Sequence, residues 1–230
     1  HNSGVEWNHE HNSVTTETIP SHFVPKMLPD ASLNNFIPKM DNLTNEDKLN
    51  SGLEKLTGLV NSYSEWIDKS EQTMLADFSG EPNQIISDEI QEQINEGRLA
   101  VSRMYASIET LKTNALARKA FCHSNKAIQI SQEDPSVTSM EKGDFRWRPF
   151  QIAFQLLNIN GLIAFDESDP HYSERGIVDL ACFPTGGGKT EAYLGLISFI
   201  GFFRRLMNPE QEKLPAVHAI MRYTLRLLTM

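Results

Sequence analysis

A glycine-rich stretch between two apolar segments constrains this chain more than any other feature. The stretch reads Pro-Thr-Gly-Gly-Gly-Lys-Thr-Glu and occupies residues 184–191. An apolar run at 176–183 precedes it, and a longer apolar segment at 191–207 follows it. A short apolar run that ends at a proline is typical of a buried strand, whereas the longer segment is typical of a buried helix. The order of strand, glycine loop and helix is that of a phosphate-binding loop.

Each residue type in this stretch suits a nucleotide phosphate. Glycines let the backbone approach a ligand closely, and successive N–H groups at a helix N-terminus attract anions. Lys189 is the candidate catalytic residue, predicted to bind the β- and γ-phosphates of ATP, and the Thr190 hydroxyl is predicted to bind Mg²⁺. The strict motif has a glycine where this chain has Phe183, so a glycine-rich turn without a ligand is the alternative. The predicted nucleotide-binding residues of the stretch are Pro184, Thr185, Gly186, Gly187, Gly188, Lys189, Thr190 and Glu191.

The remainder of the chain divides by composition. Residues 1–45 contain several prolines and predict an irregular region, whereas residues 46–131 carry apolar residues at helical spacing and predict a helical domain. A polar linker is predicted at 132–143. A second short apolar run at 216–221 follows Pro215, and strand–helix–strand order predicts a parallel sheet and an α/β fold class. The apolar stripes predict packed faces of a helical bundle, with a coiled-coil surface for a partner as the alternative.

Charge and composition limit the classes of partner. The net charge is −9, and residues 1–140 carry all of it because 11 basic residues there face 20 acidic ones. Nucleic acid is therefore not expected to bind by bulk charge, only through local basic residues. The longest nearly apolar run, 193–203, is about half the ~20 residues that a membrane-spanning helix needs, so no membrane association is predicted. Two cysteines without a C-x-x-C motif are compatible with a reducing compartment, and a cytoplasmic location is predicted.

Two further segments carry chemistry. The string Phe-Arg-Trp-Arg-Pro-Phe-Gln ends at Gln151, whose side-chain amide has the donor and the acceptor that read the N6/N7 edge of adenine. The alternative is a helix start whose aromatic rings belong to the core. Downstream, the segment at 221–228 combines a threonine hydroxyl with arginine guanidinium groups, which suit phosphate oxygens of a nucleic-acid backbone. The alternative there is an amphipathic helix with solvated arginines.

Together, the strings RPFQ, FPTGGGKTEAYLG and MRYTLRLLT resemble superfamily 2 helicases, and among them the DrmA-type helicases of DISARM anti-phage systems. The resemblance implies that residues 144–230 form the first part of a RecA-like P-loop NTPase lobe with a truncated parallel sheet. It also implies that Gln151 contacts adenine, that Phe145 stacks on the base, and that DNA backbone is contacted by Arg222, Thr224 and Arg226.

The resemblance further implies ATP-driven DNA unwinding or translocation, ATP and Mg²⁺ as cofactors, a DrmB-type partner protein and a role in restricting phage DNA. Such motors need a D-E-x-[HD] segment after the phosphate loop and arginines from a second lobe. The letters Asp-Glu-Ser-Asp occur only at 166–169, before the loop. We therefore expect a fragment of a longer protein that does not hydrolyse ATP efficiently alone. The alternatives are another P-loop ATPase, such as an AAA-type remodeller, and a nucleotide-binding scaffold without turnover.

Overall fold

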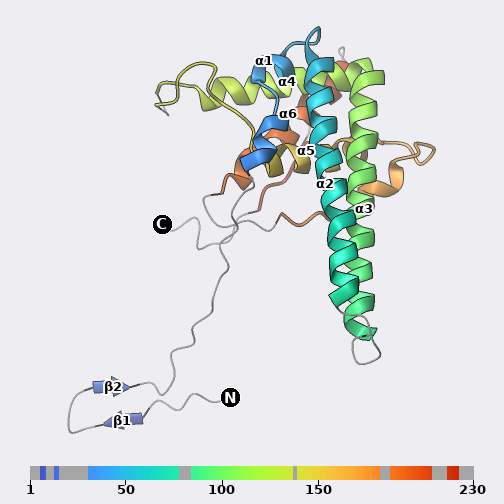
Figure 1. Ribbon diagram of the computed structural model, residues 1–230. Coiled ribbons are helices and arrows are strands. Elements are labelled where there is room, and N and C mark those ends of the chain that lie inside the picture. The colour runs from blue at the N-terminus through green and yellow to red at the C-terminus, as the bar shows by residue number, and fades with distance from the viewer. Residues whose placement is uncertain are drawn as a thin grey trace. The chain divides into compact units, whose positions relative to one another are not determined.

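The structure is a computed structural model (Figure 1) that describes residues 6–8, 13–15, 31–77, 84–136, 139–181, 187–208 and 217–222. The chain divides into two units, His1–Asp30 and Ala31–Met230. In the first unit, β1 (Glu6–Asn8) pairs antiparallel with β2 (Ser13–Thr15), and Trp7 lies opposite Val14. This hairpin lies within the region 1–45 that the sequence predicts to be irregular.

A long antiparallel pair of helices dominates the second unit. It follows the short elements η1 (Ala31–Phe36) and α1 (Met40–Thr44) and consists of α2 (Leu49–Asp77) and α3 (Gln84–Thr113), which lie side by side in Figure 1. Most of the apolar stripe that the spacing predicts is buried, whereas its member Ile86, near the start of α3, is 44% exposed. Its fully or nearly buried members are Leu53, Leu56, Val60, Ile67, Ile94, Val101, Met104, Ile108 and Leu111.

Three more helices complete the body, in which α6 (Lys189–Met207) packs on both α4 (Ala115–Gln132) and α5 (Pro149–Ile163). Asn114 starts α4 by accepting hydrogen bonds from the N–H groups of Leu116 and Ala117. The indole N–H of Trp147 donates to Asn125 Oδ1 at 2.7 Å, so the chain segment before α5 is attached to α4 by a satisfied buried polar pair. Packing of α4, α5 and α6 therefore sets the positions in space of the first turns of α5 and α6.

The predicted α/β class with a RecA-like parallel sheet is wrong. The runs 176–183 and 216–221 were expected to be strands, yet their described parts, Gly176–Ala181 and 217–221, contain no strand, and no strand occurs in the described part of Ala31–Met230. A strand gains its stability from hydrogen bonds to a neighbouring strand and from burial of its apolar side chains. Burial is missing here, because the exposed fractions are 92% for Val178, 89% for Leu180 and 88% for Ile220.

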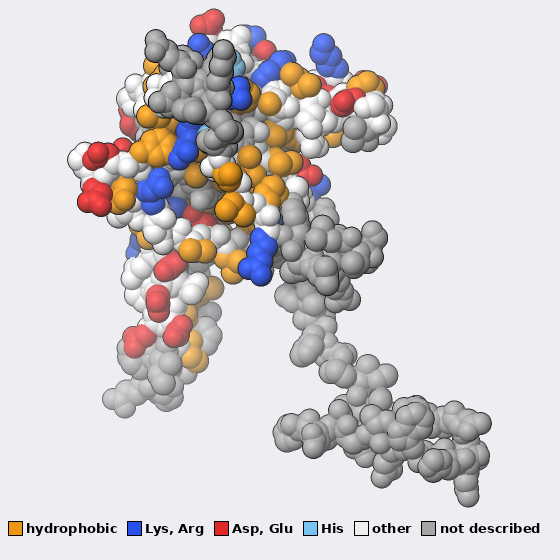
Figure 2. Space-filling view, turned by 180° about the vertical axis from the view of Figure 1, so that it is seen from behind, with side chains coloured by type: hydrophobic (Ala, Val, Ile, Leu, Met, Phe, Trp, Pro, Cys, Tyr) orange, Lys and Arg blue, Asp and Glu red, His pale blue; other side chains and the backbone are white. Residues whose placement is uncertain are grey.

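Side-chain type differs between the helical pair and the body. Figure 2 shows apolar side chains gathered on the rear face of the body and acidic side chains along the protruding end of the α2–α3 pair. Arg98 on α3 binds Asp68 and Glu71 on α2, at 3.3 and 2.5 Å. None of the helices in the described ranges combines the length and the apolar character needed to cross a membrane.

Candidate functional site

The N-terminal ends of α5 and α6 meet, which brings together two of the motifs singled out in the sequence. Pro149 occupies the first position of α5, where its missing N–H has no cost and its fixed φ suits a helix. Gln151, in the first turn, folds back so that its Oε1 accepts a hydrogen bond from the Arg148 backbone N–H at 2.8 Å. The side chains of Arg148 and Gln151 then face the glycine-rich stretch.

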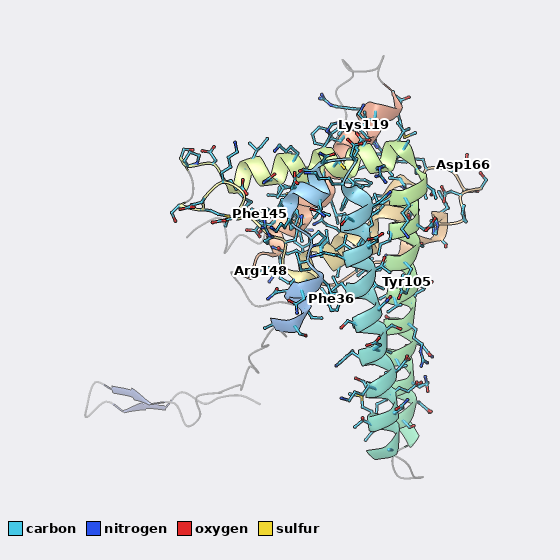
Figure 3. All side chains as sticks on the ribbon, turned by 45° about the horizontal axis from the view of Figure 1, so that its top comes forward. Phe36, Tyr105, Lys119, Phe145, Arg148 and Asp166 are labelled. Carbon is cyan, nitrogen blue, oxygen red and sulfur yellow. The ribbon has the colours of Figure 1, made fainter. Side chains whose placement is uncertain are left out.

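Two hydrogen bonds join this helix start to the glycines. Gln151 Nε2 donates to the carbonyl oxygen of Gly188 at 2.7 Å, and Arg148 Nη1 donates to the carbonyl oxygen of Gly187 at 2.7 Å. The side chain of Gln151 is buried, with 3% of the residue exposed. Segments 37 residues apart in the chain are thus in direct contact at the start of α6. Figure 3 labels Arg148 on the same side of the body as Phe145.

Gly188 is required by backbone geometry and by space. It precedes α6 with φ of +86°, in the left-handed region that favours glycine. A Cβ atom at this position would lie 2.6 Å from Gln151 Nε2. The close approach of Gln151 to the α6 start therefore depends on the absence of a side chain at Gly188.

We predict that Gly188→Ala destabilises the protein by about 1 to 2 kcal/mol, because alanine pays a left-handed backbone cost of that size, and displaces Gln151. Urea unfolding followed by circular dichroism measures the loss. Gly143→Ala is the matched control, since Gly143 also has a positive φ of +93° but nothing within 4 Å of its Cβ position. Both variants share the backbone cost, so only Gly188→Ala should also perturb the NMR signal of the Gln151 side-chain amide. An unshifted signal would contradict the assigned contact.

The amide of Gln151 retains the groups that adenine requires. A glutamine side chain has two N–H donors and a carbonyl oxygen with two lone pairs. The hydrogen bonds to Gly188 and Arg148 use one donor and one lone pair. Among the contacts of the described residues, one N–H and one lone pair remain, and this is the pair of groups that reads the N6/N7 edge of adenine.

The first turn of α6 contains the other predicted ATP ligands. Lys189 is partly exposed, Thr190 is exposed and Glu191 is partly exposed. Glu191 Oε2 is itself buried and has no hydrogen-bond partner among the described residues, and it would lie 3.3 Å from a Cβ atom at Gly188. A carboxylate this close to the glycines adds a negative charge to the site. The arrangement places a cation, a hydroxyl and a carboxylate on consecutive positions of one helix start.

The other predicted site residues are less closely grouped. Phe145 lies in the core, 5% exposed, with its ring edge-to-face on Trp147 at a centroid distance of 5.2 Å. Arg222 is exposed on an irregular segment. Asp166, the first residue of the Asp-Glu-Ser-Asp string, is exposed and lies on the opposite side of the helices from Arg148 in Figure 3. Five predicted residues lie outside the described ranges, namely Pro184, Thr185, Gly186, Thr224 and Arg226.

Sequence reasoning missed a buried ion-pair network that lies next to the chain leading into the glycines. Arg103 on α3 makes a bidentate contact with Asp179, with both N–O distances at 2.8 Å, and its Nε lies 3.4 Å from Glu174 Oε2. The hydrogen bond to Asp179 raises the pKa of the Arg103 guanidinium. The signal for this network was present in the sequence, because Asp179 is the single charge within the apolar run 176–183.

Arg148 was also missed as a member of the site, although it belongs to the quoted RPFQ string. Its guanidinium adds a positive charge 2.7 Å from the backbone of Gly187. No group of three or more His, Cys, Asp or Glu residues that could hold a metal ion occurs among the described residues. Within these residues, the Thr190 hydroxyl remains the candidate ligand for Mg²⁺.

Comparison with known proteins identifies a relative over nearly the whole chain. No protein-family model matches. Over 98% of its length, however, the chain is 33% identical to the DISARM protein DrmA of Bacillus paralicheniformis. The chain resembles DrmA. The match confirms the resemblance to the DrmA type, and it covers the helical region as well as the motifs. The chain spans only about a fifth of the length of DrmA, since the aligned part is 21% of that protein.

Proposed function

We propose that this chain contains the ATP-binding site of a DrmA-like protein. The observation that supports this most strongly is the 2.7 Å hydrogen bond between Gln151 and Gly188, because it joins the adenine-reading candidate to the start of the phosphate-binding stretch. A phosphate at the N-terminus of α6 would meet backbone N–H groups and the positive end of the helix dipole. A base within reach of Gln151 would meet its remaining N–H and lone pair.

In this proposal each residue of the site has one role. Residues 185–188 surround the phosphates through their backbone N–H groups, and Lys189 neutralises the β- and γ-phosphates. Thr190 binds Mg²⁺, and Gln151 selects adenine. When bound, Mg²⁺ would neutralise the charge of the two terminal phosphates. Arg148, beside Gly187, would add favourable charge on the same side.

For a DrmA-like protein as a whole, we propose an ATP-dependent DNA helicase or translocase in anti-phage defence. The similarity to a DISARM protein supports this. DNA backbone would be contacted through Arg222, Thr224 and Arg226, and a DrmB-type protein would be a partner. The 230-residue chain alone is expected to bind ATP without hydrolysing it efficiently, because transition-state charge in such motors is stabilised by additional groups.

Isothermal titration calorimetry of the chain with Mg-ATP tests the proposal. We expect saturable binding of one ATP per chain and weaker binding of Mg-GTP, because guanine presents O6, an acceptor, where adenine presents the N6 donor. A phosphate-release assay on the same sample should give no enzyme-like turnover. Absence of ATP binding would refute the nucleotide site. Rapid ATP hydrolysis that depends on Lys189 would refute only the expected inactivity.

A further inference from the structure

Asp179, which precedes the glycine-rich stretch, forms an ion pair with Arg103 on helix α3. Arg103 lies in the middle of α3 and its side chain is 7% exposed, while that of Asp179 is 16% exposed. Each terminal nitrogen of Arg103 donates to one carboxylate oxygen of Asp179, Nη1 to Oδ1 and Nη2 to Oδ2, both at 2.8 Å. A planar guanidinium on a carboxylate fixes orientation as well as distance, because two parallel hydrogen bonds form at once.

Apolar packing contributes little at the two residues that flank Asp179. The flanking side chains, Val178 and Leu180, are 92% and 89% exposed. They therefore bury almost no apolar area, and burial of these two side chains does not stabilise the segment. Among the side chains at 178–180, Asp179 is thus the one that attaches this segment to the body. We propose that Arg103 and Asp179 are positioning residues, which fix the segment preceding the glycine-rich stretch and thereby pre-organise the proposed ATP site.

Helix α5 is the common reference for two attachments, one before the glycine-rich stretch and one within it. Within the stretch, Gln151 on α5 binds the carbonyl oxygen of Gly188. Before the stretch, Asp179 binds Arg103 on α3, and Arg103 also donates to the carbonyl oxygen of Leu157 on α5 at 2.8 Å. With the chain held at both points, less conformational freedom is lost when a ligand binds. Loss of either attachment should therefore weaken ligand binding.

The inference rests on the proposed ATP site, and its test separates the two. Mg-ATP affinity of the full 230-residue chain is measured by calorimetry for wild type, Asp179→Asn and Asp179→Glu. Glu174→Gln is the matched control, because Glu174 also contacts Arg103 but lies in η3 (Tyr172–Gly176), before the segment 177–181, and the substitution keeps the carbonyl oxygen that accepts from the Ile177 N–H. Circular dichroism checks helical content, and each titration is made well below the unfolding midpoint of that variant.

We expect Asp179→Asn to weaken Mg-ATP binding about tenfold, since pre-organisation is lost. Glu174→Gln should bind within a few-fold of wild type, and Asp179→Glu should restore most of the affinity because it keeps a carboxylate for Arg103. Hydrogen exchange at 177–181 should rise in Asp179→Asn, with or without ATP. Equal affinity of wild type and Asp179→Asn would overturn the inference, as would equal losses in Asp179→Asn and Glu174→Gln. If wild type itself does not bind ATP, the proposed site fails; unchanged exchange at 177–181 would then also overturn the positioning role.

Discussion

Replacing Arg103 by alanine should destabilise the helical unit by about 3 to 5 kcal/mol, the cost of leaving buried charges without their partner. The substitution removes the partner of Asp179 and Glu174, whose side chains are 16% and 11% exposed. It also leaves the carbonyl oxygen of Leu157 without its donor. Three elements, α3, α5 and η3, would lose a shared contact. Urea unfolding followed by circular dichroism at 222 nm measures the change.

Arg98→Ala is the control for this prediction, because Arg98 lies on the same helix and also binds two carboxylates, Asp68 and Glu71. Its side chain is 46% exposed, so water replaces the lost contacts and the midpoint should change far less. Arg103→Met separates lost packing from lost charge pairing, since the methionine side chain retains some packing but leaves the carboxylates of Asp179 and Glu174 without their partner. If Arg103→Ala and Arg98→Ala lower stability equally, the buried network does not have the energetic role assigned to it.

Lys189→Ala should abolish most of the ATP affinity while leaving the fold unchanged. A hydrogen bond to a charged group is worth about 1.5 to 3 kcal/mol, which corresponds to roughly a ten- to hundredfold increase in Kd. Lys189 begins α6, and alanine is a strong helix former, so helical content should not fall. Calorimetric titration with Mg-ATP measures the affinity, and circular dichroism measures the helical content.

Lys119→Ala provides the charge-matched control for Lys189→Ala. Lys119 is exposed on α4 and lies apart from Arg148 in Figure 3, and its removal changes the net charge by the same amount. It should leave ATP affinity unchanged. Thr190→Ala distinguishes the contribution of the metal to binding from that of the phosphates. Loss of a Mg²⁺ ligand should weaken Mg-ATP binding more than it weakens binding of ATP in the presence of a chelator. ATP binding that survives Lys189→Ala undiminished would refute the assigned role of the lysine.

The helical part of the fold could be predicted well because its determinants are local. Apolar spacing in α2 and α3 selects one face, and this face is the buried one, as the burial of Leu56 and Ile108 shows. Asn114 and Pro149 mark helix starts by chemistry that acts within a few residues. The run 176–183 was misassigned because a strand also needs a partner, and periodicity alone contains no information about one.

In the candidate site, too, local sequence and tertiary contacts determined different features. The sequence alone determined the chemical groups: the glycines, Lys189, Thr190 and the amide of Gln151 are present whatever the fold. Tertiary structure decided which of these groups meet. Packing of α4, α5 and α6 placed Gln151 on Gly188, buried Phe145 in the core and joined Arg103 to Asp179 across 76 positions. Spacing along a chain fixes neighbours only within a helix turn or a loop, whereas contacts between distant residues follow from which apolar faces bury one another.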